Sequence, residues 1–233
     1  MKMRRMIALS VLIVSLLNTY VLAYANEADK ENEISQVISD INSYISVNDD
    51  GTLTRANCIT GIMQAIGLDK NDADISANAA YFIPVFSDRV YDEKCKGYII
   101  EAVLAGIMKG VTDSSSPLVL SEEKATLKEC ITFMLRCLKG VDFHVWNGDT
   151  VSMAIDVGLL TENEAGNINP EQYLTIDTYN MLLSRMLDMN RYLYYKPIRL
   201  DKGSGVRQRV GTDESGSLKY IDWLSEINSD TNN

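Results

Sequence analysis

Hydrophobic residues recur at helical spacing in three stretches of the chain, and each stretch begins at a threonine. In the first stretch, Leu53 to Gly67, the apolar face occupies positions i, i+3, i+4, i+7 and i+8. The same pattern returns 72 residues later and again 49 residues after that. A threonine hydroxyl can accept from the free backbone N–H groups of a first helical turn, so we expect Thr54, Thr126 and Thr175 to be N-caps. The three faces predicted to be buried are Cys58, Gly61, Ile62, Ala65 and Ile66; Cys130, Phe133, Met134, Cys137 and Leu138; and Tyr179, Leu182, Leu183, Met186 and Leu187.

A second repeated pattern precedes the later two of these helices. Residues Ala102–Met108 match Ala154–Leu160 at an offset of 52, and in each case a polar loop leads on to the capped helix. The first capped helix has only an unrelated helix in that place. The shared cap, the shared buried face and this preceding segment predict an internal repeat, with two full units and one partial unit.

Other segments carry weaker patterns. Glu33 to Ile45 follows helical spacing and predicts an amphipathic helix, and further helices are expected from about Glu93 to Met108 and from Asp149 to Leu160. The segment from Leu68 to Ala80 is polar and predicts a loop with one short turn. The segment from Tyr81 to Phe86 is apolar but contains a proline, so it is expected to be extended and docked on the rest.

The N-terminus has the composition of a targeting segment. Lys2, Arg4 and Arg5 form a basic start, an apolar core follows over residues 7–17, and Ala23-Tyr24-Ala25 forms a cleavage site. We therefore predict a signal peptide over residues 1–25, which leaves no integral membrane segment after cleavage. A retained N-terminal anchor is the alternative, and in either case the rest of the chain leaves the cytoplasm.

The net charge limits the range of partners. It is −10 for the full chain, and removal of the three basic residues of the targeting segment makes it −13. A field of this sign repels nucleic acid and generally anionic surfaces, although it leaves room for a local basic pocket. Nucleic acid is therefore not expected as a partner.

The chain has four cysteines, Cys58, Cys95, Cys130 and Cys137. An even number in an exported protein is typical of disulfides. However, three of them occupy the predicted apolar faces, where a free thiol serves as a small hydrophobic side chain. Disulfide frameworks also belong mainly to domains too small for a core, so free thiols are favoured.

No residue pattern predicts catalysis, a metal or a cofactor. Asn48-Asp49-Asp50-Gly51 is similar to a calcium loop, but Ser46 and Asn57 then stand where carboxylate ligands are needed, so a helix-ending turn is favoured. The single histidine, His144, lacks the partners of a zinc site or a triad. Carboxylates are plentiful enough for a glycosidase pair, but nothing in the sequence singles out two of them.

The residues Leu53-Thr54-Arg55-Ala56-Asn57 resemble the "ITRAE" signature of the S-layer homology domain family. Further residues follow in the order of that family: Phe86-Ser87-Asp88, Tyr98-Ile99, Ala105-Gly106-Ile107 and Gly110. The resemblance covers roughly residues 33–189 and implies an all-α fold, a pseudo-threefold bundle of S-layer-homology-like helical repeats. The implied units are a partial one over 33–68 and two full ones over 82–140 and 141–190, followed by a C-terminal extension over 191–233 that is partly flexible.

The resemblance also implies a function. Members of the family hold exported proteins at the bacterial cell wall by binding anionic secondary cell-wall polysaccharide noncovalently. An arginine in a first helical turn places a five-donor fork beside free N–H groups, which suits a carboxylate on a sugar. The residues expected to bind this ligand are Thr54, Arg55, Asn57, Gly106, Gly110 and Lys128.

The later repeats depart from the signature. Leu127 and Ile176 stand at the positions equivalent to Arg55, and neither can bind an anion, so at most one groove is expected to be competent. Arg55 itself has a second interpretation, as a solvated residue or the partner of Asp49 or Asp50. The alternative function is therefore a protein-interaction or structural module of the envelope, which contacts another envelope protein through the extension.

Overall fold

The structure is a computed structural model. It describes residues 28–78, 92–109, 118–138, 149–189, 192 and 195, and the backbone of two strands at 209–212 and 218–221. This part of the chain is mostly helical, as predicted. A helix over residues 28–44 comes first. It is followed by α2 (Arg55–Ala65), α3 (Lys70–Asn78), α4 (Glu93–Leu104), α5 (Leu127–Cys137), α6 (Thr150–Val157), α7 (Glu162–Ala165) and α8 (Ile176–Asp188).

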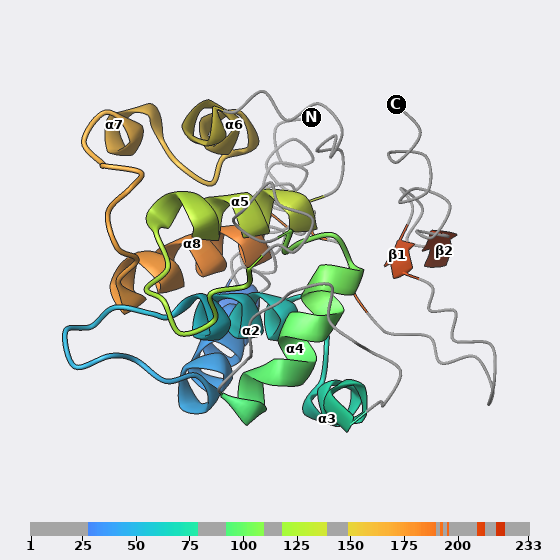
Figure 1. The fold of residues 1–233 in the computed structure, drawn as a ribbon. Coiled ribbons are helices and arrows are strands. Elements are labelled where there is room, and N and C mark those ends of the chain that lie inside the picture. The colour runs from blue at the N-terminus through green and yellow to red at the C-terminus, as the bar shows by residue number, and fades with distance from the viewer. Residues whose placement is uncertain are drawn as a thin grey trace, which may run out of the picture.

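The capped helices α2, α5 and α8 lie together in the middle of the molecule, with α6 and α7 on one side and α3 and α4 on the other (Figure 1). The strands β1 (Arg209–Thr212) and β2 (Leu218–Ile221) pair antiparallel as a hairpin in the C-terminal extension.

The three predicted N-caps are confirmed. The hydroxyl oxygens of Thr54, Thr126 and Thr175 each accept from the backbone N–H three residues further on, at 3.2 to 3.4 Å. All fifteen residues of the predicted faces are buried, and the fourteen apolar ones belong to a single hydrophobic core. The periodicity therefore identified both where these helices begin and which side of each is covered.

The residues that precede the three caps exchange backbone hydrogen bonds in a closed ring. Leu53 N–H donates to the carbonyl of Leu174 (3.0 Å), Leu174 N–H to that of Ala125 (2.8 Å), and Ala125 N–H to that of Leu53 (2.9 Å). We call these three residues the central ring. One position beyond each cap the pattern is repeated: Arg55 N–H donates to Glu123, Leu127 N–H to Gln172, and Ile176 N–H to Gly51. Each first turn thus has at least one of its free N–H groups satisfied by a neighbouring segment.

The segments matched at an offset of 52 end in the same way. Gly106 and Gly158 are left-handed, with φ of 69° and 87°. The next residue in each case donates back to the helix, Ile107 to the Ala102 carbonyl at 2.9 Å and Leu159 to the Ala154 carbonyl at 2.8 Å. Glycine adopts this conformation without strain, which is why α4 and α6 end earlier than their apolar patterns predicted.

The prediction of a loop from Leu68 to Ala80 is wrong, because this segment contains the nine-residue helix α3. The carboxylate of Asp69 accepts from the N–H of Asp72 at 2.8 Å and so caps the first turn. Ala73 and Ser76 are buried in the side that faces α4. The polar composition reflects a helix with a narrow buried face. The polar segment Thr161 to Leu174 likewise contains the one-turn helix α7.

All four cysteines are free and buried, as favoured from the sequence. Several expectations lie outside the described residues: the targeting segment 1–25, the extended segment from Tyr81 to Phe86, and the surroundings of Gly110 and His144. Among the helices that are described, none has the length and apolar character needed to span a bilayer.

Candidate functional site

The start of α2 brings together three of the six expected ligand-binding residues, Thr54, Arg55 and Asn57. Thr54 accepts from both the backbone N–H and the side-chain amide of Asn57, the latter at 2.8 Å. The Asn57 Oδ1 accepts from the N–H of Ser46 at 2.8 Å and from the thiol of Cys95. Burial raises the pKa of that thiol to about 12, so it stays protonated and able to donate. Asn57 therefore links α2 to α4 through Cys95, and to the segment before α2 through Ser46.

Arg55 is buried, with 3% of its surface exposed. Its Nε donates to the carbonyl of Val119 at 2.8 Å, and its guanidinium forms an ion pair with the carboxylate of Glu129. The guanidinium carbon also lies 5.8 Å from the centre of the Phe133 ring. The pairing of Arg55 with Asp49 or Asp50 is therefore not observed, since Glu129 is the partner and Asp50 instead pairs with Lys124.

Glu129 joins two helix starts through one carboxylate. Its Oε1 accepts from Arg55 in the first turn of α2, and its Oε2 accepts from the N–H of Thr126 at 2.9 Å, completing a capping box on α5. The charge and the fork of Arg55 are thus used inside the protein. This differs from the expectation that the arginine faces an external sugar carboxylate.

The other three expected residues are placed separately. Gly106 forms the left-handed end of α4, and a Cβ built on it would meet nothing within 4 Å. Gly110 lies outside the described residues. Lys128 is exposed in the first turn of α5, with its ammonium 3.1 Å from the carboxylate of Glu171. Lys128 is therefore a surface cation that already has an acidic neighbour.

Two arginines that the sequence reasoning missed occupy equivalent places in α5 and α8. Arg136 donates to the carbonyl of Ile107 at 2.7 Å, and Arg185 donates to the carbonyl of Leu159 at 3.0 Å. Both acceptors follow the left-handed glycines that end α4 and α6. The two arginines are 49 residues apart, which is also the spacing between Thr126 and Thr175. This shared spacing could have identified them from the sequence as equivalent residues.

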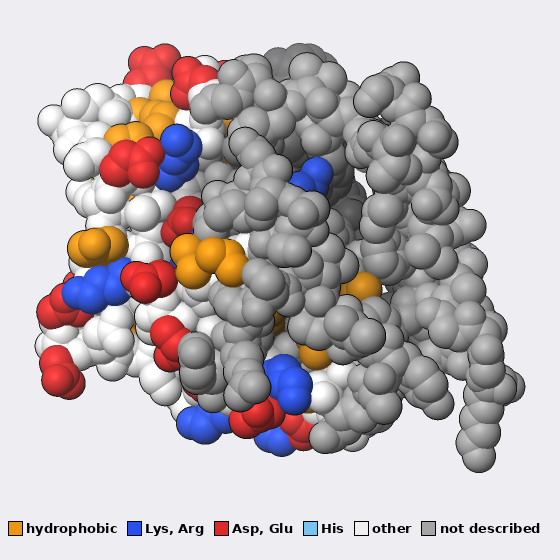
Figure 2. Space-filling view, viewed as in Figure 1, with side chains coloured by type: hydrophobic (Ala, Val, Ile, Leu, Met, Phe, Trp, Pro, Cys, Tyr) orange, Lys and Arg blue, Asp and Glu red, His pale blue; other side chains and the backbone are white. Residues whose placement is uncertain are grey.

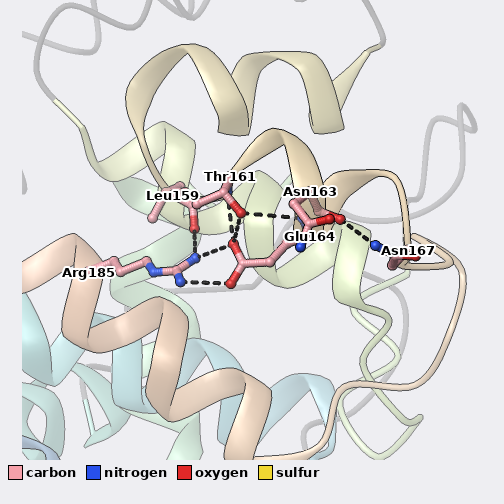
Figure 3. Close-up of polar contacts among 6 residues, drawn as sticks. All are labelled: Leu159, Thr161, Asn163, Glu164, Asn167 and Arg185. Carbon is pink, nitrogen blue, oxygen red and sulfur yellow. Dashed lines mark hydrogen bonds and ion pairs between the residues drawn. The ribbon is translucent and has the colours of Figure 1, made fainter.

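Arg185 also holds the carboxylate of Glu164 in a two-pronged ion pair (Figure 3), with both nitrogen–oxygen distances at 2.7 Å. The same carboxylate accepts from the backbone N–H of Thr161 at 2.9 Å and so caps α7. Arg185 is the main reason that the pKa of Glu164 falls to about 2, with the bonds from Thr161 adding to it.

This pair predicts a pH dependence of stability. Because the folded-state pKa of Glu164 lies below its ordinary value of 4.5, its contribution is present above pH 4.5 and is lost as the pH falls towards about 2. The thermal midpoint should therefore fall over this range by more in the natural protein than in Glu164→Gln. Other carboxyl groups, such as Asp50, titrate in both proteins, so the difference isolates Glu164. Equal losses in the two proteins would contradict the assignment.

One exposed aromatic side chain, Tyr173, lies beside the N-cap of α5, where its backbone pairs with that of Thr126. Tyr173 is 57% exposed, and the ammonium of Lys124 lies 5.1 Å from the centre of its ring. An exposed ring next to a cation offers a flat apolar face and a positive charge together. On the face drawn in Figure 2, most of the visible lysine and arginine side chains lie next to acidic ones, so no broad basic patch forms on its described part.

No protein-family model matches this sequence, and no curated protein matches it either. In the ranges that the structure describes, no three His, Cys, Asp or Glu side chains are grouped in a way that could hold a metal ion.

Proposed function

We propose that this protein is an exported, noncatalytic module of the bacterial cell envelope, built from degenerate S-layer-homology-like repeats, that contacts another envelope protein. The observation that carries the proposal is the placement of Arg55. It is the one arginine that resembles the anion-binding signature, and it is buried in an ion pair with Glu129. The chain thus keeps the arginine of the signature, but the N–H donors of Arg55 bind Val119 and Glu129 inside the protein.

The proposed architecture is a pseudo-threefold bundle of three repeats. The central ring supports it, because Leu53, Ala125 and Leu174 donate to one another in cyclic order. The matched glycine ends of α4 and α6 support it, and so do the matched arginines late in α5 and α8. Three segments that share a cap, a face and a ring position fit a duplicated unit better than three unrelated helices.

Binding a sugar carboxylate at Arg55 would carry a cost. The incoming anion would have to displace Glu129, which would leave that carboxylate without its cation beside the cap of α5. The anion would take the place of Glu129, so the ligand gains only the difference between its own pairing with Arg55 and the pairing that Glu129 gives up. Such an exchange leaves little net affinity, so the pairing of Arg55 favours a structural role.

The second candidate function is attachment to anionic wall polysaccharide at a different place. The observation that favours it is the exposed ring of Tyr173 with Lys124 beside it. A sugar ring could stack on the tyrosine while its acidic group competes with Asp50 for the lysine, in an ion pair that is exposed on both sides. This surface does not use Arg55, so the two candidates can be separated by experiment.

Cosedimentation with envelope fragments tests the two candidates. If the partner is a protein, the mature chain should sediment with fragments that retain their proteins and fail to do so after the fragments are treated with protease. Deletion of residues 196–233, which keeps the buried Tyr195 in place, should abolish this capture if the extension is the contact. Purified, protein-free sacculi should not bind.

The outcome that would replace the first candidate with the second is equally specific. The chain would then sediment with protein-free sacculi and lose binding when the secondary polymer is extracted. Tyr173→Ala should lose that binding, whereas Arg55→Lys should keep it. Loss with Arg55→Lys in a protein that remains folded would restore the arginine as the ligand-binding residue.

A further inference from the structure

The chain after α8 returns to the helical body and pairs with it at two points. Tyr192 forms an isolated antiparallel bridge with Leu138, at the end of α5. Three residues later, the N–H of Tyr195 donates to the carbonyl of Ile66 at 2.7 Å, at the end of α2. The segment therefore runs from the end of one capped helix to the end of another.

Tyr195 is inserted into the body rather than lying on it. Its side chain is 4% exposed, and its hydroxyl donates to Oε2 of Glu101 at 2.6 Å. Glu101 belongs to α4 and has no exposed surface. The other carboxylate oxygen of Glu101 accepts from the hydroxyl of Ser76 in α3, which is also fully buried. The tyrosine hydroxyl thus reaches a buried polar pair, which consists of Ser76 in α3 and Glu101 in α4.

The buried pair of Ser76 and Glu101 favours a tyrosine side chain over other residue types. A buried carboxylate is costly unless donors satisfy its oxygens, and here Ser76 and Tyr195 each provide one. The ring of the tyrosine adds buried apolar area that a serine or threonine could not provide. A phenylalanine would fit the space but would remove a donor from the Glu101 carboxylate.

We propose that Ser76, Glu101 and the carbonyl of Ile66 form a tyrosine-docking site, and that its occupant, Tyr195, is a releasable clasp for the C-terminal extension. Opening the clasp breaks the hydroxyl and backbone bonds of Tyr195. The caps and the central ring lie elsewhere and stay intact, so release is a local opening. The clasp holds whether or not the proposed envelope role is correct.

Amide hydrogen exchange on the full mature chain tests the clasp. Tyr195→Phe keeps the ring and removes the donor, so protection at residues 192–195 should fall roughly ten- to a hundredfold. Glu101→Gln should lower the same protection in a folded protein. Protection in α5 and α8 should stay unchanged in Tyr195→Phe, which distinguishes local release from general loss of stability.

Tyr173→Phe is the matched control, because Tyr173 is exposed and has the same hydroxyl to lose. It should leave exchange at residues 192–195 unaltered. The clasp is overturned if Tyr195→Phe exchanges at these residues like the natural protein. It is also overturned if the variant loses protection equally throughout α5 and α8, since Tyr195 would then be an ordinary core residue.

Discussion

Arg55→Ala is expected to lower the free energy of unfolding by about 3 kcal/mol, because it leaves the Glu129 carboxylate without its cation at the junction of α2 and α5. The variant also loses the bond from Nε to the Val119 carbonyl and the packing against Phe133. Urea unfolding of a chain that begins at residue 26, followed by circular dichroism, measures the difference.

The matched control is Lys128→Ala, in the first turn of α5. Its ion pair with Glu171 is exposed on both sides, so its loss should change the free energy of unfolding by less than about 0.5 kcal/mol. If Arg55→Ala were as mild as this control, Arg55 would not be part of the internal framework, and the case for a structural role would be lost.

Gly97→Ala is expected to destabilise the protein by about 3 kcal/mol through a clash between α4 and α3. A Cβ at Gly97 would run into the carbonyl oxygen of Ala73 and lie 2.5 Å from its carbonyl carbon. The backbone of Ala73 cannot rotate away from the added Cβ as a side chain could, so α3 and α4 must move apart. The thermal midpoint and the urea midpoint should both fall.

Gly166→Ala serves as the control for this substitution. Its added Cβ would meet backbone oxygens at 3.6 and 3.8 Å, which is ordinary contact, and its φ of −69° suits any residue. A change within about 0.5 kcal/mol is expected. A Gly97→Ala protein as stable as the natural one would show that α3 does not pack against α4 at this distance.

The three capped helices could be predicted because two independent signals agree in each. The threonine hydroxyl marks the first turn, and the apolar spacing marks the covered face, as in Thr126 with Cys130 and Phe133. Both signals depend on residues close together in the chain. The matched glycines, Gly106 and Gly158, were visible in the sequence as well, but their role in ending α4 and α6 was not predicted.

The helix α3 could not be predicted from its composition. Its covered side needs only small residues, Ala73 and Ser76, because Gly97 allows α4 to approach closely. The apolar spacing that identifies a helix is therefore weak, and the cap at Asp69 is the one local sign. Tertiary contact decides the structure of such a segment.

The burial of Arg55 and its pairing with Glu129 could not be predicted from the sequence either. The arginine and Glu129 are 74 residues apart, and nothing in either neighbourhood states that they meet. Asp49 and Asp50 were nearer in the chain, but Asp50 instead pairs with Lys124. Pairing between residues so far apart depends on how α2 and α5 pack together, which local sequence patterns do not show.

Arg55 links the start of α2 to the start of α5 through Glu129, and a double-mutant cycle tests this link directly. Glu129→Gln removes the charge but keeps a side chain that can complete the capping box on Thr126. Urea unfolding of Arg55→Ala, Glu129→Gln and the double variant should give a coupling energy of at least about 1.5 kcal/mol. Effects that add within about 0.3 kcal/mol would contradict the claim.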